Sequence, residues 1–351
     1  MNRGDVRAGL LGLGAVLLAA AAAAREPDVS LARLDELAGA LAQLPPGFAV
    51  DPAREQVFLD LDRFFEAAVR PGQPFDLAQR PNPLWQWIDR RLLGTLAEAA
   101  APPANPGGLV VWQMYNMGLL CRAGATVIGL DLISLPGTGP EFTRRTAGLV
   151  DALFITHEHP DHYDAALVQA CLDAGKPVFL PAALAAARPP HPLLRAMDEF
   201  HETGAAGIQV TARRGIHVWA KARTDIHLVY YELVFPSGQA LLFCGDLDYT
   251  REFEKTPERT LDLLVIPWRS PSARYEPGAA EQVAERKEAV QIALDRVRPR
   301  HLLFSHYAEL GHVRDGMEAS YAIAAGLKRA VPAPSEWLFW GERLELAPPA
   351  P

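Results

Sequence analysis

The sequence THEHPDHYD at residues 156–164 is the most informative part of the chain, and it directly follows the apolar, strand-like run LFI at residues 153–155. His157 and His159 are two residues apart, so an extended segment projects both side chains to one side. Asp161 and His162 fall where the chain turns into the next helix, where they can face the first pair. Imidazole and carboxylate groups together suit zinc and neighbouring divalent metals. A solvated histidine-rich loop is the disfavoured alternative, because histidines so crowded repel one another when protonated.

Composition limits the classes of protein to consider. The 351 residues include 34 Lys and Arg, 42 Asp and Glu, 49% hydrophobic residues and 3 cysteines, with a net charge of −8. This composition is that of a globular protein and excludes collagen, coiled coils and disulfide mini-proteins. The sequence has no long basic run, so we expect a small-molecule substrate and no nucleic acid. The cysteines form no CxxC motif and are flanked by apolar residues, which predicts buried thiols.

The N-terminus has the features of a secretory signal peptide. Arg3 and Arg7 precede the nearly uninterrupted apolar run of residues 8–24, which ends in an alanine stretch before Arg25. This order predicts a signal peptide over residues 1–24 and export to a periplasmic or extracellular location. The alternatives are an uncleaved N-terminal anchor, which would be the only membrane contact, and a cytosolic helix.

The rest of the chain divides into a helical and a mixed region. Leucines at helical spacing from Ser30 to Leu44, and amphipathic stretches near 59–68 and 85–96, predict a helical N-terminal region over residues 25–106. Beyond it, short apolar runs bounded by glycine and proline predict strands, with helices at about 164–174, 279–297 and 316–330. The sequence PSG at 236–238 predicts a hairpin between two such strands. We therefore expect a separate mixed domain over residues 107–351.

The motif resembles the HxHxDH signature of the metallo-β-lactamase fold superfamily, which matches His157, His159, Asp161 and His162 one for one. The resemblance covers roughly residues 108–346 and implies an α/β (α+β) fold, a four-layer αββα sandwich, with the helical N-terminal region outside it. In that family the first two histidines and a distant third bind one metal, and the aspartate and last motif histidine bind another. The resemblance therefore implies two divalent metal ions, zinc foremost, with Mn2+ or Fe2+ also compatible.

The resemblance also implies a bridging aspartate and a last histidine from later strands. Asp246 ends the apolar run LLFCGD at 241–246, and His306 follows the run LLFS at 302–305, which are the arrangements that the family uses. His312 is the reserve candidate for the last histidine. The His306-Tyr307 pair and the sequence HPDHYD lean toward the ascorbate-6-phosphate-lactonase-like and phospholipase-D-like branches.

The third histidine leaves alternatives open. His227 lies upstream of Asp246 and just before an expected strand, so it is our candidate for this metal ligand. The family's His-Thr-Pro-Gly-His stretch is replaced here by RTDIH at 223–227. Asp225 and His217 therefore remain alternatives, as does a site with no ligand at this place, which would hold the first ion weakly.

Asp131 is a candidate supporting residue. It follows the apolar run IGL at 128–130, and in the family an aspartate after the third strand lies behind the metals. There it could orient a ligand histidine. An aspartate that only makes a turn is an equal alternative.

The resemblance implies an enzyme, a metallo-hydrolase with a dinuclear site. A water shared by two ions has its pKa lowered toward neutrality and can attack a small ester, lactone or phosphodiester as hydroxide. Asp161 faces that water in relatives and is the catalytic candidate, because it can help to manage the proton. The alternatives are an exported, non-catalytic metal- or ligand-binding protein with a degenerate site, and redox chemistry on a di-iron version of it. The sequence has no GxSxG elbow and no P-loop, which argues against serine hydrolysis and nucleotide chemistry.

Overall fold

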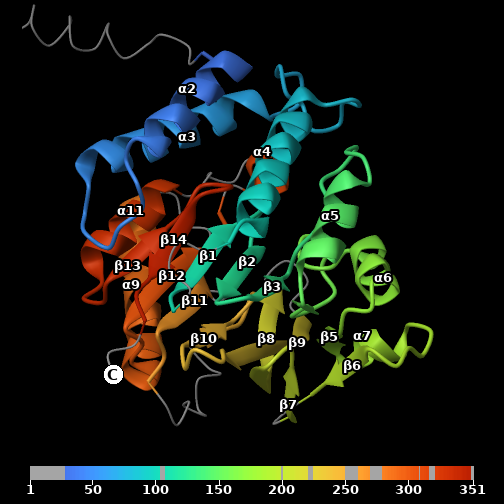
Figure 1. Cartoon of the computed structure of the whole chain (residues 1–351). Helices are drawn as coiled ribbons and strands as arrows, with labels where there is room; N and C mark the ends of the chain where they lie inside the picture. Colours follow the sequence, from blue (N-terminus) through green and yellow to red (C-terminus); the bar gives the residue numbers. More distant parts are fainter. Residues whose placement is uncertain are drawn as a thin grey trace, which may run out of the picture.

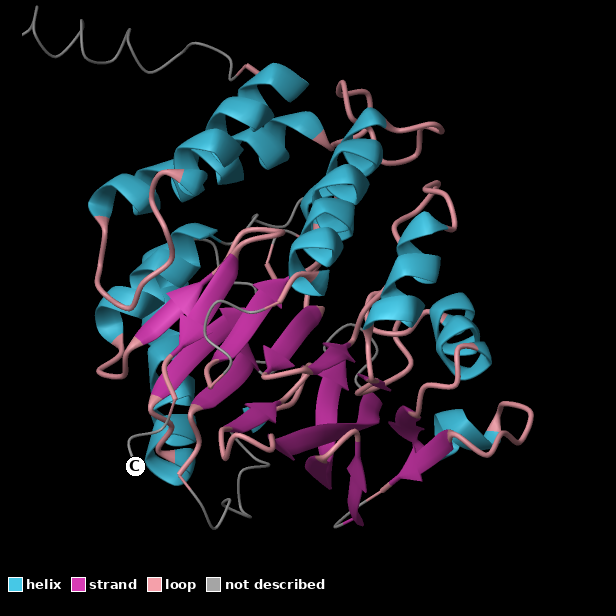
Figure 2. Ribbon diagram, in the orientation of Figure 1, coloured by secondary structure: helices cyan, strands magenta, loops and turns pink. Residues whose placement is uncertain are grey.

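Two mixed sheets of seven strands face each other at the centre of the protein, with helices around them (Figures 1 and 2). The computed structural model describes residues 28–102, 107–198, 201–219, 224–249, 260–268, 279–307, 309–315 and 321–348. The predicted α/β sandwich with a helical N-terminal region is confirmed. The predicted signal segment, residues 1–24, lies outside the described residues.

The first sheet has the strand order β14-β1-β2-β3-β4-β5-β6. Strands β14, β1, β2 and β3 pair antiparallel, whereas β3, β4, β5 and β6 pair parallel. The parallel pairing of β3 with β4 brings their carboxyl ends to one edge of the sheet. The strands are β1 (Leu109–Gln113), β2 (Leu119–Ala123), β3 (Thr126–Leu130), β4 (Ala152–Phe154), β5 (Val178–Pro181), β6 (Leu194–Met197) and β14 (Arg343–Leu346).

The second sheet has the strand order β13-β12-β11-β10-β9-β8-β7. Strands β10 to β13 pair parallel, and β7, β8, β9 and β10 pair antiparallel. The hairpin predicted around PSG joins β9 to β10 and is confirmed. The strands are β7 (His201–Ala205), β8 (Ile208–Trp219), β9 (Thr224–Val234), β10 (Ala240–Phe243), β11 (Leu263–Pro267), β12 (His301–Ser305) and β13 (Ser335–Trp337).

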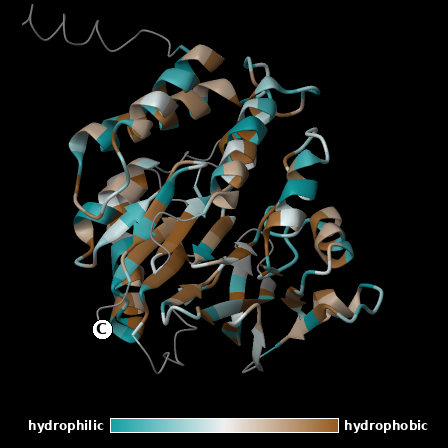
Figure 3. Ribbon diagram, viewed as in Figure 1, coloured by the Kyte–Doolittle hydropathy of each residue, from teal (hydrophilic) through white to brown (hydrophobic). Residues whose placement is uncertain are grey.

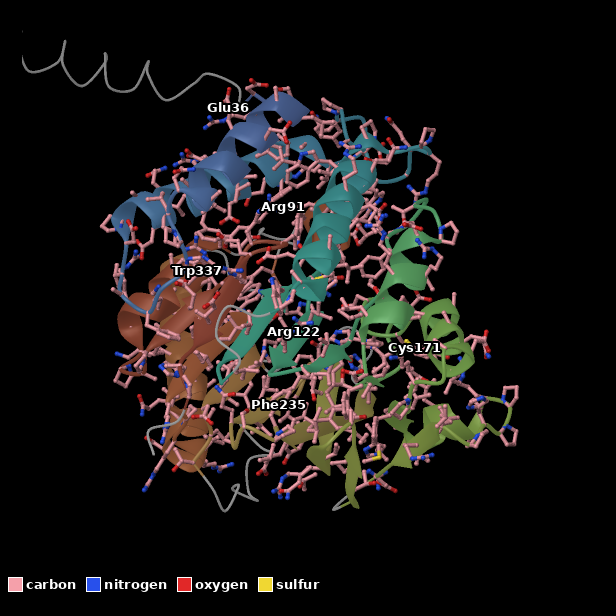
Figure 4. All side chains as sticks on the ribbon, in the orientation of Figure 1. Glu36, Arg91, Arg122, Cys171, Phe235 and Trp337 are labelled. Carbon is pink, nitrogen blue, oxygen red and sulfur yellow. The ribbon has the colours of Figure 1, made fainter. Side chains whose placement is uncertain are left out.

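The alternation of side chains along the strands divides the core into an inner and an outer part. Leu109 and Val111 of β1 pack between the two sheets, whereas Val110 and Trp112 of the same strand pack outward in the cluster that includes the helices. Figure 3 shows the hydrophobic colouring concentrated on the central strands. All three cysteines are free and buried, as predicted, and Figure 4 labels Cys171 on α6 (Ala165–Asp173).

The N-terminal helices begin where the sequence provides caps. Ser30 caps α2 (Leu31–Ala42), Asp51 caps α3 (Pro52–Ala68) and Asn82 caps α4 (Pro83–Ala100), each by accepting backbone N–H bonds. Proline fits at the first position of α3 and α4, because it has no backbone N–H and a helix needs no N–H donor at this position. The other described helices are α5 (Glu141–Leu149), α6, α7 (Ala182–Ala186), α9 (Ala279–Val297), α10 (Leu310–Arg314) and α11 (Tyr321–Ala330).

Polar contacts join the N-terminal helices to the C-terminal part of the chain. Arg54 of α3 binds Glu342 through two hydrogen bonds of 2.8 and 2.6 Å, and both side chains are buried. Asp62 of α3 accepts the backbone N–H of Tyr321 at 3.0 Å, at the start of α11. Arg91, labelled on α4 in Figure 4, donates to the carbonyl of Trp340. Buried side chains of these helices belong to the same hydrophobic cluster as the outer core of the sandwich. No helix in the described part of the chain has the length and hydropathy of a membrane span.

Candidate metal centre

Histidines and aspartates from distant parts of the chain meet at one place. The contributing residues follow β4, β10 and β12 or lie on β8, so both sheets supply them. They form two groups, and within each group the candidate ligand atoms lie within 4.8 Å of one another. The first group is His157, His159, His217 and Asp246. The second group is Asp161, His162 and His306.

Asp246 lies between the two groups. Its Oδ1 atom is 3.2 Å from His306 Nε2 and 3.4 Å from His162 Nε2. Its Oδ2 atom is 3.6 Å from His217 Nε2. One carboxylate therefore faces histidines of both groups.

The first pair of motif histidines is held close together. His157 Nε2 lies 3.0 Å from His159 Nδ1, and the two rings meet edge to face with centroids 4.5 Å apart. Burial, and the charge of His162 nearby, lower the pKa of His157 well below its ordinary value. Burial also lowers the pKa of His217. Neutral imidazoles are the form that binds a metal.

The second group has the opposite electrostatics. Burial alone would lower the pKa of His162, but the carboxylates of Asp161, Asp246 and Asp131 outweigh it and raise that pKa well above its ordinary value. The same balance, with Asp246 as the strongest attractive charge, raises the pKa of His306 to about 10. Burial would raise the pKa of Asp246, yet the cationic His306 and His162 hold it well below the ordinary value. The carboxylates of Asp161, Asp246 and Asp131 thus stabilise positive charge in this group.

Two buried atoms in this centre point to a cation. His162 Nε2 and Asp246 Oδ1 are buried and 3.4 Å apart, yet neither has a hydrogen bond of good geometry to a described residue. Buried polar atoms without partners are rare and costly in a folded protein. A donor set of imidazole nitrogens and carboxylate oxygens fits a divalent ion at these atoms, so the residues present suit the metals that the sequence predicts.

Asp131 holds the motif from behind. It follows β3 with φ 46° and is fully buried. Its Oδ1 accepts the N–H of Thr156 at 2.7 Å, and its Oδ2 accepts the Thr156 hydroxyl at 2.6 Å. The same Oδ2 lies 2.7 Å from His162 Nδ1. Asp131 therefore combines both expected roles, because it fixes the backbone after β4 and contacts a candidate ligand histidine.

Glycine allows the two loops that carry candidate ligands to approach each other. Gly245 precedes Asp246, and its φ is 54°. A Cβ atom at this position would lie 2.5 Å from Thr156 Oγ1, which is closer than real Cβ atoms come. Gly245 therefore lets the Asp246 loop pack directly against the residue that precedes His157.

The structure corrects the assignment of the third histidine. His227 is exposed and belongs to neither group. On the β8–β9 ladder His227 pairs with Ile216, whereas His217 pairs with Ile226. Adjacent residues of a strand face opposite sides, so His227 and His217 point away from each other, and His217 is the one beside Asp246. The reserve candidate His312 also lies outside both groups, where its Nδ1 contacts Glu309.

Asn116 is a site residue that the sequence analysis missed. It lies between β1 and β2, is buried, and donates from Nδ2 to Asp161 Oδ2 at 2.6 Å. A lone asparagine in a hairpin carries no metal-ligand signature, because asparagine in a turn usually serves the backbone.

Comparison with known proteins adds the family to this geometry. The family model described as "Beta-lactamase superfamily domain" matches residues 129–307, just over half of the 351 residues. The chain belongs to this family. The matched range of the β-lactamase superfamily domain includes both groups of candidate ligands. The resemblance based on the HxHxDH motif is therefore confirmed for the superfamily, and the branch stays a prediction.

Several solved structures resemble this β-lactamase superfamily protein. Igni18, a metallo hydrolase from the archaeon Ignicoccus hospitalis, is 14% identical, with 68% of this chain and 99% of that chain covered and a TM-score of 0.48. The metallo-beta-lactamase fold protein YhfI from Bacillus subtilis is 14% identical, with coverages of 68% and 99% and a TM-score of 0.45. CmlA, a diiron beta-hydroxylase from Streptomyces venezuelae, is 15% identical, with coverages of 70% and 54% and a TM-score of 0.44. No curated protein sequence matches the chain.

Proposed function

We propose that this chain is a metal-dependent hydrolase that holds two divalent ions, zinc foremost, and acts on a small ester, lactone or phosphodiester. The observation that carries the proposal is Asp246, whose two oxygens face histidines of both candidate groups. A carboxylate in that position suits two neighbouring cations better than one. The family membership supports hydrolysis as the reaction class.

The two groups divide the ligands between two ions. Asp246 would contact both ions. Divalent ions bound there would lower the pKa of a water between them and polarise the substrate oxygen. The first ion would be held by His157, His159 and His217, and the second by Asp161, His162 and His306.

The protein's own side chains would orient this centre and handle the proton. Asp131 accepts from His162 Nδ1, which leaves Nε2 free of a proton to face an ion once the histidine is neutral. The side chain of Asp161 is 23% exposed, compared with 12% for Asp246. Asp161 is therefore the more accessible ligand carboxylate, and we propose that it holds the proton released during attack on the substrate.

The third-histidine position bears on the alternative of a non-catalytic binding protein. The doubtful ligand at this place motivated that alternative, and His217 now lies there beside Asp246. A complete set of candidate ligands favours turnover over binding alone.

We further propose, from the sequence of residues 1–24 alone, that the protein is exported.

The test measures metal content and hydrolysis on protein lacking residues 1–24. Elemental analysis should find about two divalent ions per chain, and a panel of esters, lactones and phosphodiesters should include a substrate. His157→Ala, His217→Ala and Asp246→Ala should each lose metal and activity. His227→Ala is the matched control and should retain both. Protein with two ions that hydrolyses no member of the panel would favour the binding alternative.

A further inference from the structure

We infer that Asn116 is a positioning residue for the second metal group, because its side-chain amide holds the Asp161 oxygen that faces His162 and His306. The inference rests on the proposed function, since it requires an ion at that group. It assigns to Asn116 a role in the affinity of this ion rather than in contact with the substrate.

The contacts of Asp161 Oδ2 carry the inference. Asn116 Nδ2 donates to this oxygen at 2.6 Å. The same oxygen lies 3.3 Å from His162 Nε2 and 3.4 Å from His306 Nε2. Asn116 therefore fixes the one carboxylate oxygen that both imidazoles of the group face. A carboxylate oxygen has a second lone pair for a cation while it accepts this hydrogen bond.

The backbone of Asn116 is itself held from both sheets. Its carbonyl accepts from Gln113 Nε2 at 2.6 Å and from Ser305 Oγ at 3.3 Å. Gln113 ends β1 in the first sheet, and Ser305 ends β12 in the second sheet, directly before His306. The amide that positions Asp161 is thus tied to the strand that supplies the last histidine.

The N-terminal helices support the same hairpin. The ring of Tyr115 packs between Trp85 of α4 and Trp340, with centroid distances of 5.4 and 5.7 Å. Its hydroxyl accepts the backbone N–H of Leu310 at 3.1 Å, at the start of α10. Because these contacts fix Tyr115, the residue directly before Asn116, less conformational entropy is lost when Asn116 is held in one conformation.

The residue type fits this role. Asn116 has φ 55°, a left-handed conformation that asparagine tolerates better than most residues. A side-chain amide supplies a donor without charge, whereas an aspartate at 2.6 Å would repel Asp161. The Oδ1 atom of Asn116 is buried and accepts no hydrogen bond from the described residues. Turned around, the amide could instead offer this oxygen to the ion directly, so the test must separate a donor from a ligand.

The experiment compares ion binding in wild type, Asn116→Gly and Asn116→Asp by calorimetric titration of the metal-free full chain with Zn2+. Glycine keeps the backbone conformation and removes the amide, and aspartate keeps the shape but replaces the donor by an oxygen. We expect both variants to bind one ion as wild type does and the second about 10- to 100-fold more weakly. Ala206→Gly is the matched control, because Ala206 also has a left-handed φ, 51°, in an exposed turn. It should bind both ions unchanged.

Each outcome decides between roles. Wild-type affinity for both ions in Asn116→Gly would overturn the inference. Second-ion binding in Asn116→Asp as tight as in wild type, or tighter, would overturn the donor role in favour of a ligand role. Equal weakening of both ions would indicate a merely structural role and would also overturn it. A wild type that binds two ions without hydrolysis would contradict the proposed function alone, whereas a wild type without a second ion would overturn both.

Discussion

Replacing Asp131 by asparagine should weaken the second ion while the fold persists. Asp131 Oδ1 accepts from Thr156 N at 2.7 Å, a bond that the carbonyl of asparagine can keep. In wild type, Asp131 Oδ2 lies 2.7 Å from His162 Nδ1. In the variant, the amide nitrogen of asparagine takes the place of this oxygen. Two N–H donors cannot face each other, so His162 must present Nδ1 as an acceptor and carry its proton on Nε2. That tautomer turns a proton toward the second ion instead of a lone pair.

The expected magnitude follows from the hydrogen bond that Asp131→Asn removes. Removing the partner that orients a metal-binding histidine typically costs about 10- to 100-fold in affinity, or about 1.4 to 2.8 kcal/mol. The charge-assisted hydrogen bond from His162 is lost, whereas the Thr156 hydroxyl can turn to accept from the new amide, so the free energy of unfolding should fall by about 1.5 to 3 kcal/mol, which a domain of ordinary stability survives. The first ion should be affected less, because Asp131 reaches His157 only through the Thr156 hydroxyl, which lies 3.0 Å from His157 Nδ1.

Competition titrations against a chelator of known affinity, with urea denaturation as a check on folding, measure both quantities. Asp151→Asn is the control, since Asp151, directly before β4, also accepts a backbone N–H, that of Val127 of β3 at 2.9 Å, but lies outside both groups of candidate ligands. Second-ion affinity in Asp131→Asn within about twofold of wild type would refute the tautomer argument.

Two further substitutions and one measurement of ion binding have defined outcomes. Arg54→Met leaves the carboxylate of Glu342 buried without its bidentate partner, so urea denaturation should show a loss of about 3 to 5 kcal/mol, and a loss below about 1 kcal/mol would contradict the structure. Gly245→Ala forces alanine into a left-handed φ and brings its Cβ against Thr156, so the free energy of unfolding should fall by at least about 1 to 2 kcal/mol. Ion binding measured by calorimetry should also weaken. An unchanged urea midpoint would contradict the close approach of Gly245 to Thr156. At neutral pH, His162 and His306 are in the charged imidazolium form in the metal-free protein, because the carboxylates around them raise the pKa of both. The pKa of His306 is raised to about 10. Ion binding should therefore release about two protons and tighten as pH rises, which calorimetry in buffers of different ionisation enthalpy measures; zero release would contradict these pKa shifts.

The same raised values set how the metal-free protein responds to pH. A histidine whose pKa is higher in the folded than in the unfolded state stabilises the fold below the unfolded pKa, and this contribution disappears as pH rises through the folded value. For His306 the loss would occur near pH 10. Asp161 and Asp246 have lowered pKa values, so their contribution is present above the unfolded pKa and disappears as pH falls through the folded values. The metal-free protein should accordingly be most stable between these limits.

Local sequence signals were sufficient for much of the fold. The N-terminal helices are marked by leucine spacing, caps and prolines, and they occur at Leu31–Ala42, Pro52–Ala68 and Pro83–Ala100. The strands β1, β2, β3, β11 and β12 coincide with apolar runs between glycine and proline. The apolar run WLFW at 337–340 extends beyond β13 (Ser335–Trp337), and its residues Phe339 and Trp340 pack in the cluster that includes the N-terminal helices.

The segment 194–219 could not be predicted in the same way. Polar residues, arginines and glycines interrupt the apolar residues of its strands β7 and β8, and only the register of the ladders that these strands form decides which face each side chain takes. The error at His227 has the same origin. Choosing between His217 and His227 requires the register of β8 on β9, which depends on tertiary contacts rather than on the residues around either histidine. The motif at 157–162 needed no such information, since its members are neighbours in the sequence.

The supply of ligands from both sheets has a consequence for the integrity of the sandwich. His157 and His162 follow a strand of the first sheet, and Asp246 and His306 follow strands of the second. An ion shared by these side chains would fasten the two halves of the chain to each other, as a disulfide does in other proteins. The three cysteines of this chain form no such bond. Metal supply would then govern how long the protein resists unfolding and proteolysis, independently of any reaction at the site.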